Sequence, residues 1–190
     1  MFDLDPFSGT SSANQSHKNN ELKQSTQCLT FQLGGETYAI EISYVKEIIE
    51  FSQYSSIPAV PKFFRGILDL RGRPVPVIDL GIRFTGHELD VSKRSCIVIV
   101  ELKTDNSILE MGLIIDNVNE VIDIYNDQIE PPPSFGQRIN TEFMTGITRV
   151  NNNFIIILDI HHVLPTEDLN LIDQHSQPEA PPATEHWVHW

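Results

Sequence analysis

Residues 65–80 read RGILDLRGRPVPVIDL, a stretch that is apolar enough to be buried and yet carries three arginines, two aspartates and two prolines. Residues 66–70 and 75–80 are rich in Ile, Leu and Val, which favours two β-strands. Gly72 between them allows a tight turn that a side chain would obstruct. We therefore expect a β-hairpin whose turn, residues 71–73, holds its arginines at the surface.

Two prolines, Pro74 and Pro76, restrict the second strand of this hairpin. A proline nitrogen cannot donate to a β ladder, so such a strand lies at the edge of a sheet or carries a bulge. Prolines also protect an edge against wrong pairing. The pattern thus predicts an edge strand or a bulged strand for residues 75–80.

The rest of the chain between residues 27 and 160 has mainly the pattern of β-strands. Further strands are expected at residues 28–33, 36–40, 96–102, 110–116, 118–124, 142–150 and 153–160. Gly34-Gly35 and the three asparagines at 151–153 mark the turns of two hairpins. Residues 96–102 are so rich in Ile and Val that we expect both faces of that strand to be buried. Many short strands without a βαβ rhythm predict a barrel or a sandwich.

One segment, residues 41–51 (EISYVKEIIEF), has a different period. Ile42, Val45 and Ile49 lie at i, i+3 and i+7, which predicts a short amphipathic helix. Its open face would show Lys46, Glu47 and Glu50.

The two ends of the chain differ in composition from its centre. Residues 1–26 are rich in Ser, Asn and Gln and are interpreted as a flexible leader, while residues 27–173 form the folded domain. Residues 161–173 predict a short helix interrupted by Pro165. Residues 174–190 form a proline-containing tail that holds both tryptophans, Trp187 and Trp190, either as a docking motif or incidentally.

Composition and charge exclude several classes of protein. The 190 residues suffice for one domain or two small ones, and no apolar run reaches the ~18–20 residues of a membrane span. Without a signal-peptide pattern, a cytoplasmic location is expected. The net charge of −13 argues against nucleic acid as a partner. Basic residues concentrate between Lys62 and Arg94. They are interpreted either as a docking surface for an acidic partner or as an ordinary solvated surface.

An enzyme is the first alternative that the residues allow. A carboxylate pair could come from Asp79, Asp116, Asp123 and Asp159, but each lies near a strand end, where Asp commonly terminates a strand. The chain has no G-x-S-x-G, H-E-x-x-H or phosphate-loop motif, and His161-His162 has no nucleophile context. Cys28 and Cys96 make no metal framework and are expected to pack as reduced, small hydrophobic residues. We expect no catalysis, no metal site and no cofactor.

Residues 63–80, FFRGILDLRGRPVPVIDL, resemble the signature of the CheW family, the coupling proteins of bacterial chemotaxis. Residues 29–49, 111–133 and 143–160 are similar to further segments of that family in the same order, so the resemblance runs over about residues 28–173. It implies a mainly β fold of two packed, five-stranded SH3-like β-barrels, with a short helix and a C-terminal helix.

The resemblance also implies a function. A CheW-like protein has no catalytic activity and links the cytoplasmic tips of methyl-accepting chemoreceptors to the regulatory domain of the histidine kinase CheA. Receptors, kinase and coupler form membrane-associated arrays, in which other copies of the coupler are candidate ring partners. A coupler of a related pathway with a non-flagellar output, such as surface behaviour or second-messenger synthesis, remains the alternative.

The resemblance assigns two groups of residues. Glu47 and Arg71 match positions tied to receptor coupling, and their neighbours Val45 and Gly72 are included in that group. A salt bridge from Arg71 to Glu47 that only fixes the turn is an equally open interpretation.

A second group is assigned to the kinase. Arg65 and Gly66 match a basic-Gly pair near the kinase-facing side, and Cys96 and Ile97 match a strand start associated with kinase contact. Plain core packing is the alternative for Cys96 and Ile97.

Overall fold

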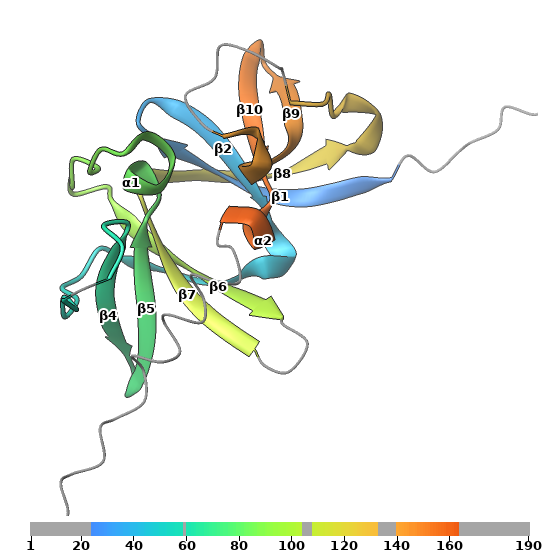
Figure 1. The fold of residues 1–190 in the computed structure, drawn as a ribbon. Coiled ribbons are helices and arrows are strands. Elements are labelled where there is room, and N and C mark those ends of the chain that lie inside the picture. Colours follow the sequence, from blue (N-terminus) through green and yellow to red (C-terminus); the bar gives the residue numbers. More distant parts are fainter. Residues whose placement is uncertain (1–23, 59, 104–107, 133–139, 164–190) are drawn as a thin grey trace, which may run out of the picture.

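The computed structural model describes residues 24–58, 60–103, 108–132 and 140–163 (Figure 1). Its strands are β1 (Ser25–Leu33), β2 (Glu36–Glu41), β3 (Val45–Glu50), β4 (Phe64–Leu70), β5 (Arg73–Asp79), β6 (Cys96–Lys103), β7 (Ile108–Ile115), β8 (Asn117–Tyr125), β9 (Met144–Val150) and β10 (Asn153–Leu158). Its α-helices are α1 (Leu80–Thr85) and α2 (Ile160–Val163), and single 3-10 turns are η1 (Ile42–Tyr44), η2 (Asn126–Gln128) and η3 (Thr141–Phe143).

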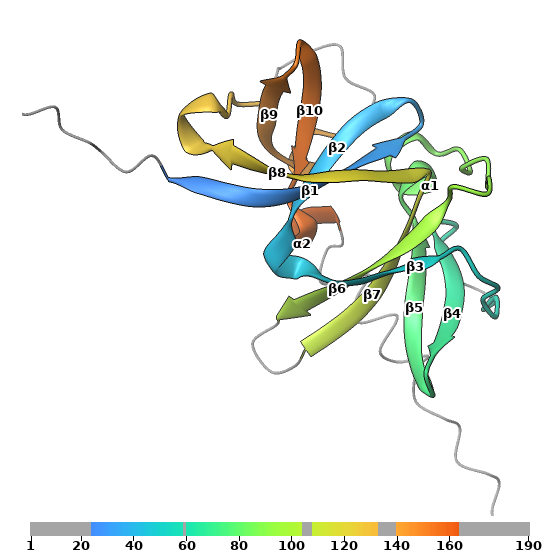
Figure 2. The same ribbon diagram turned by 180° about the vertical axis from the view of Figure 1, so that it is seen from behind.

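The strands form two five-stranded sheets, each curled into a small barrel (Figures 1 and 2). Barrel 1 has the order β8-β1-β2-β10-β9, and barrel 2 has the order β3-β6-β7-β5-β4. Neighbouring strands are antiparallel except for β2 with β10 and β5 with β7, which are parallel. The mainly β class with two packed five-stranded barrels and short helices, implied by the resemblance, is confirmed.

Each barrel is closed by one pair of backbone hydrogen bonds between its outer strands. In barrel 2, Ser55, which follows β3, and Ile67 of β4 each donate an N–H to the other's carbonyl at 2.8 Å. In barrel 1, Glu130, which follows β8, and Ile147 of β9 do the same at 2.8 Å. A closed sheet leaves fewer unpaired edge groups, so these bridges protect both barrels against edge-to-edge pairing.

A glycine makes each closing bridge possible. Gly66 and Gly146 stand directly before the bridged isoleucines, and a Cβ on them would lie 2.0 Å from the Ser55 carbonyl oxygen and 2.6 Å from that of Glu130. Gly66 also has a φ of +147°, in a region that L side chains rarely adopt. The two backbones can therefore approach only because these positions lack a side chain.

Residues 63–80 and 143–160 are two copies of the same structural segment, in which each residue of the first copy corresponds to the residue 80 positions later. The shared residues are Phe63 and Phe143, Gly66 and Gly146, Ile67 and Ile147, and Asp79 and Asp159. The backbone agrees as well, because the N–H groups of Asp79 and Asp159 donate to the carbonyls of Phe63 and Phe143 at 2.8 and 2.9 Å. The chain thus has two similar halves, β1–α1 and β6–α2, that exchange their first hairpins: β1–β2 completes the barrel of β8–β10, and β6–β7 completes the barrel of β3–β5.

Three apolar clusters hold this arrangement. The largest contains residues of both barrels, among them Phe31 of β1 and Leu113 of β7, and therefore joins the barrels. The two smaller clusters fill the barrel interiors, around Ile97 and Ile99 in barrel 2 and around Ile155 and Ile157 in barrel 1. Because β6 contributes to both the shared core and the interior of barrel 2, its expected burial on both faces is confirmed.

The hairpin expected at residues 65–80 is present as β4 and β5. Its two turn residues, Arg71 and Gly72, have φ values of 56° and 81°, the left-handed conformation that suits a two-residue hairpin. The expected edge position is wrong for β5 as a whole, because β4 is the outer strand. However, β7 pairs only with Val77–Asp79, so the proline-containing half of β5 has β4 as its one ladder partner.

The expected helix at residues 41–51 is wrong. Only Ile42–Tyr44 form a helical turn, η1, and Val45–Glu50 form strand β3, which pairs with β6. Strand β3 has six residues, and three of them, Val45, Ile48 and Ile49, are β-branched. Pairing with the apolar strand β6 therefore outweighs the helical period of the sequence. Tertiary contact, which the local pattern cannot contain, decides this element.

Other expectations are confirmed where the structure describes them. The Gly34-Gly35 hairpin (β1–β2), the strands β7 and β8, and the closing hairpin β9–β10 are all present. The expected helix after residue 160 begins as α2, while Pro165, the tail 174–190 and residues 1–23 of the leader lie outside the described residues. Strand β1 begins at Ser25, two residues inside the expected leader. In the described part of the chain, no helix is long and apolar enough to cross a membrane.

Replacement of Gly66 tests the closing bridge of barrel 2. We expect Gly66→Ala to lower the free energy of unfolding by about 3 kcal/mol, because the methyl group would overlap the Ser55 carbonyl. Gly34→Ala is the matched control, since Gly34 also has a positive φ (59°) but nothing lies within 4 Å of its Cβ position. There we expect a loss of about 1 kcal/mol. Urea unfolding measures both, and equal losses would contradict the role of the bridge.

Candidate functional site

One end of barrel 2 carries a compact group of charged side chains, which we call the charged mouth. Its members are Lys46 and Glu47 of β3, Arg71 of the β4–β5 turn, Arg73 of β5, Glu101 of β6 and Glu110 of β7. Alternation along a strand places Glu101 on the same face as Ile97 and Ile99, at the end of the barrel interior. The six formal charges cancel, so the charged mouth is polar without a net charge.

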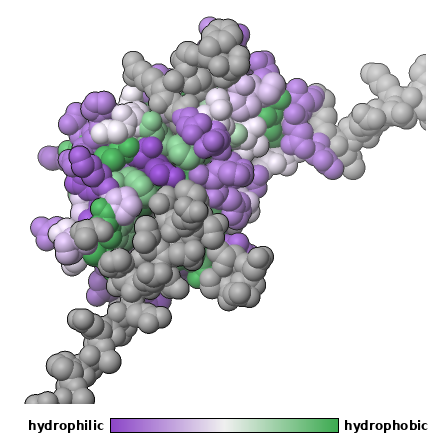
Figure 3. Space-filling model, in the orientation of Figure 1, coloured by the Kyte–Doolittle hydropathy of each residue, from purple (hydrophilic) through white to green (hydrophobic). Residues whose placement is uncertain are grey.

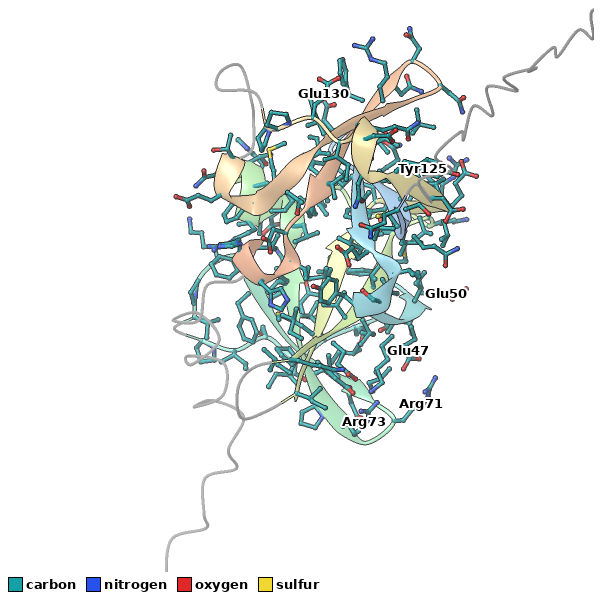
Figure 4. All side chains as sticks on the ribbon, turned by 90° about the vertical axis from the view of Figure 1, so that its right-hand side faces the viewer. Glu47, Glu50, Arg71, Arg73, Tyr125 and Glu130 are labelled. Carbon is teal, nitrogen blue, oxygen red and sulfur yellow. The ribbon has the colours of Figure 1, made fainter. Side chains whose placement is uncertain are left out.

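Glu47 and Arg71 meet across the charged mouth (Figure 4). The Arg71 guanidinium donates to the Glu47 carboxylate in a fork, Nη2 to Oε2 at 2.9 Å and Nη1 to Oε1 at 3.4 Å. Arg71 is 74% exposed and Glu47 is 21% exposed, so solvent screens the pair and its contribution to stability is at most about 1 kcal/mol. The guanidinium therefore remains accessible to a partner while Glu47 holds its position.

A β-bulge sets the direction of Glu47. The register of β3 against β6 shifts between Val45, which lies opposite Val100, and Glu47, which lies opposite Ile99. Val100 belongs to the core between the barrels, whereas Ile99 belongs to the interior of barrel 2. The extra residue, Lys46, thus turns Val45 toward the shared core and Glu47 toward the charged mouth.

Glu110 is the centre of the remaining ion pairs. It accepts hydrogen bonds from Lys46 Nζ and from Arg73 Nη1, the latter at 2.8 and 2.7 Å to its two oxygens. These two cations, Lys46 first, hold the pKa of the Glu110 carboxyl below its ordinary value. Lys46 also lies 3.6 Å from Glu101, so β3, β5, β6 and β7 are linked by charge at this end.

Val45 and Gly72, which the sequence grouped with Glu47 and Arg71, have different surroundings. Val45 is half-buried and packs against the shared core, and Gly72 is exposed at the turn beside Arg71. The Gly72 N–H donates to the Asp69 carboxylate at 2.6 Å, which fixes the turn. The structure therefore brings Glu47, Arg71 and Gly72 together at one end of barrel 2, with Val45 two residues away on the opposite face of β3.

Arg65 lies at the other side of barrel 2. Its Nε donates to the Tyr54 hydroxyl at 2.9 Å, its Nη1 lies 2.6 Å from Glu88, and its guanidinium is 5.8 Å from the centre of the Tyr54 ring. Asp79, which caps α1 by accepting from the Ile82 N–H, is 4.0 Å away. Arg65 is thus engaged within the chain, and Gly66 beside it has the structural role in the closing bridge.

Cys96 and Ile97 are buried at 9% and 0% exposure. Their strand β6 is paired on both sides, with β3 and with β7, so their backbones are engaged within the sheet and their side chains are buried. Any effect they have on a partner must act through the strands that they support.

The cysteines are reduced and buried, as expected. Burial, with a smaller effect of Glu41, raises the pKa of the Cys28 thiol to about 11, and burial raises the pKa of Cys96 as well. Thiols with raised pKa values are poor nucleophiles and poor metal ligands. Among the described residues, no group of three or more His, Cys, Asp or Glu could hold a metal ion.

The basic segment of the sequence does not form one free basic surface. Arg65, Arg71 and Arg73 pair with Glu88, Glu47 and Glu110 respectively. Arg83 of α1 lies between the equivalent rings of Phe63 and Phe143, 4.6 and 5.1 Å from their centres. The remaining basic residues of the segment, Lys62, Lys93 and Arg94, are exposed and lie in loops.

Three of the four aspartates that could have formed a catalytic pair have structural roles. Asp79 caps α1, and Asp159 accepts from the His161 and His162 N–H groups at the start of α2. Asp116 accepts from the Gly34 N–H at 2.7 Å in the β1–β2 turn. The arrangement of the charged mouth, paired charges on a rigid rim, is suited to contact with another protein.

Sequence reasoning missed Lys46, Arg73, Glu101 and Glu110 as members of the charged mouth. Comparison of the two repeated halves could have found them. The equivalent positions of barrel 1 are occupied mostly by Asn, Gln and Thr, so the charged residues of barrel 2 differ from their counterparts. These residues (Gln32, Thr37, Asn119, Asn151 and Asn153) line a shallow pocket at the equivalent end of barrel 1. Three cations and three carboxylates stand at the end of barrel 2, whereas the end of barrel 1 has neutral polar groups and the carboxylate of Glu120.

The comparisons with known proteins agree with this architecture. A family described as CheW-like domain matches residues 27–168. The chain is 31% identical to the chemotaxis protein CheW of Klebsiella aerogenes over 145 residues, which cover 76% of this chain and 85% of that protein. It is 33% identical to the chemotaxis protein CheW of Treponema pallidum over 145 residues, with 75% and 84% covered.

A solved structure gives the same result. The scaffolding protein TtCheW from Thermoanaerobacter tengcongensis superimposes with a TM-score of 0.68 at 36% sequence identity, covering 80% of this chain and 96% of that chain. The fold and the charged mouth define a two-barrel β protein that presents paired charges at one barrel end. The chain belongs to the CheW-like domain family.

Neutralisation of Glu110 tests the ion-pair network of the charged mouth. Because the pKa of Glu110 is lowered on folding, its contribution to stability is present above its ordinary pKa of 4.5 and is lost as the pH falls through the lowered value. We expect Glu110→Gln to reduce the free energy of unfolding by about 1 kcal/mol at pH 7 and by much less at pH 3.

Urea unfolding at both pH values measures this difference. Glu101→Gln is the control, because within the described residues the ion pair of Glu101 is a longer contact, 3.6 Å to Lys46, and a smaller loss is expected. A loss from Glu110→Gln that is the same at both pH values would contradict the proposed origin of the stabilisation.

Proposed function

We propose that this protein is a non-enzymatic adaptor that couples the cytoplasmic tips of methyl-accepting chemoreceptors to the regulatory domain of a CheA-type histidine kinase. The observation that carries the proposal is the match of residues 27–168 to the CheW-like domain family. The relatives are chemotaxis proteins by name, and the solved structure is titled a scaffolding protein. The adaptor works in the cytoplasm at membrane-associated receptor arrays, where other copies of the chain are further candidate partners.

The charged mouth is the proposed receptor site, with Arg71, Glu47, Val45 and Gly72 as its contact region. Arg71 supports this assignment because it is exposed and held by a short, rigid turn, so its guanidinium can contact a carboxylate on the receptor. Glu47 acts as the internal partner that orients Arg71, and a receptor carboxylate would compete with it. A contact of this kind can be weak and still specific, because an array links many such sites.

The region of Arg65 and Gly66 is the proposed kinase side, supported from within by Cys96 and Ile97. Gly66 lets β4 pair with Ser55. Arg65 holds Tyr54, in the loop between β3 and β4, and Glu88, in the loop after α1. These contacts give the surface next to the closing bridge a defined shape. Cys96 and Ile97 contribute by packing under β3 and β7.

Calorimetric titration with the regulatory domain of a CheA-type kinase from the same cell tests the adaptor function. We expect saturable binding with one protein per regulatory domain. An absence of binding by the folded protein would overturn the kinase half of the proposal. The partners found would also distinguish flagellar from non-flagellar output, because the adaptor contacts themselves are the same in both.

A charge swap tests the receptor site. We expect Arg71→Glu to leave the thermal midpoint within about 2 °C, because the pair with Glu47 is exposed, and to abolish receptor-dependent kinase activation. Arg94→Glu, which makes the same charge change at an exposed residue of another loop, is the control and should keep coupling.

The double variant Glu47→Arg with Arg71→Glu separates the two roles of the pair. If Arg71 contacts the receptor, the swapped pair restores the internal salt bridge but not the coupling. Full coupling in the double variant would show that only the internal pair matters and would overturn the assignment of Arg71 as a contact residue.

A further inference from the structure

A pocket of about 470 Å³ lies between the β1–β2 turn, α1 and the loop that follows α1. Its floor is formed by apolar and aromatic groups of Leu33, Tyr38, Phe84 and Leu89. The space-filling view shows hydrophobic surface on the left of the molecule, in the region of α1, bordered by hydrophilic residues (Figure 3). The volume is in the range of ~300–1,000 Å³ typical of sites for small ligands or single large side chains.

The floor of the pocket continues into a row of aromatic rings. The centres of Phe31 and Tyr38 are 5.9 Å apart, those of Tyr38 and Phe84 5.7 Å, and those of Phe84 and Phe143 5.5 Å. Tyr38 and Phe84, the middle members of this row, line the pocket, so a further aromatic ring can stack or pack edge-on against them. The rim adds the exposed carboxylates of Glu36 and Glu88, which can accept a hydrogen bond from a donor at the edge of that ring.

The described chain ends against α1, the helix that borders this pocket. The carbonyl of Val163, the last described residue, accepts a hydrogen bond from Arg83 Nε at 2.9 Å. Arg83 belongs to α1, whose residues Gly81, Phe84 and Thr85 line the pocket. Residues 164–190 therefore start at α1, and 21 residues separate Val163 from Glu185.

The sequence beyond Val163 contains a segment that suits the pocket. Residues 185–190, EHWVHW, hold Trp187 and Trp190, the only tryptophans of the chain, and an indole has a large apolar surface with one N–H donor. For a random coil of 21 residues the mean end-to-end distance is roughly 25 Å, and a tether of that length gives an effective concentration on the order of millimolar. An intrinsic affinity on the order of millimolar is therefore enough for substantial occupancy.

We propose that residues 185–190 bind intramolecularly in this pocket, with one indole on the Leu33, Tyr38, Phe84 and Leu89 floor and its N–H directed to the acidic rim. The occupied pocket joins the end of the second half of the chain to α1 of the first half. The bound segment covers apolar surface that another protein could otherwise contact. This inference is independent of the proposed function of the charged mouth.

Tryptophan fluorescence of the full chain tests the proposal directly, because all of its tryptophan signal comes from residues 187 and 190. We expect emission at shorter wavelength than in the urea-unfolded chain. We also expect an acrylamide quenching constant lower by up to about two-fold, since the pocket covers most of the one bound ring and the second tryptophan lies outside it. Emission and quenching equal to those of the unfolded chain would overturn the proposal.

A pair of variants locates the binding position. Leu89→Glu places a charge in the pocket and should restore the emission and quenching of the unfolded chain. Val91→Glu makes the same charge change two residues away, at a residue that is 55% exposed and does not line the pocket, and should change neither. Shielded tryptophans that do not respond to Leu89→Glu would place the segment elsewhere and overturn the proposal.

A second measurement does not depend on a change in the pocket. In methyl NMR spectra of the full chain, the Leu33 and Leu89 signals should shift when Trp187→Ala and Trp190→Ala are combined, because a bound indole adds a ring current. Unchanged signals would overturn the proposal. Fluorescence shielding that disappears on dilution would show that the segment enters the pocket of a second copy and would overturn intramolecular binding.

Discussion

The close approach of two backbones at each closing bridge is the constraint on which the structure depends. Ser55 and Ile67 in barrel 2, and Glu130 and Ile147 in barrel 1, can pair only because the residue before each isoleucine is glycine. Without these bridges the outer strands of each sheet would be free edges and the interior apolar clusters would be open to water. The charged mouth exists because barrel 2 is closed, since closure brings Arg71 of the β4–β5 turn to Glu47 of β3.

The exchange of hairpins between the halves explains why the two barrels behave as one body. Barrel 1 combines β1–β2 of the first half of the chain with β8–β10 of the second half, and barrel 2 combines β6–β7 of the second half with β3–β5 of the first. Neither half can therefore complete a barrel alone. The shared apolar core and Arg83, placed between Phe63 and Phe143, add side-chain contacts at the same junction. A rigid body of this kind suits an adaptor, because two partners bound at different places on barrel 2 keep a fixed geometry relative to each other.

The two barrel ends show how equivalent positions acquire different chemistry on one backbone. At the charged mouth, Glu110 is held by Lys46 and Arg73, while at the equivalent end of barrel 1 the neutral Gln32 donates to Thr37 at 2.9 Å. The turn residues Arg71-Gly72 and Asn151-Asn152 have the same left-handed conformation. The fold therefore fixes where such groups stand, and the side chains decide which partners each end can recognise.

The sequence by itself determined the strands with strong alternation or dense β-branched residues, the turns at Gly34-Gly35, Arg71-Gly72 and 151–153, and the family. These features depend on local chemistry, which a short stretch contains in full. Only the tertiary structure decided that Val45–Glu50 is a strand, that β5 lies inside its sheet, and that Lys46, Arg73, Glu101 and Glu110 surround the pair of Glu47 and Arg71. Each of these depends on which distant strands become neighbours, because pairing with β6 outweighs a helical period over so short a segment and sheet order sets which charges meet.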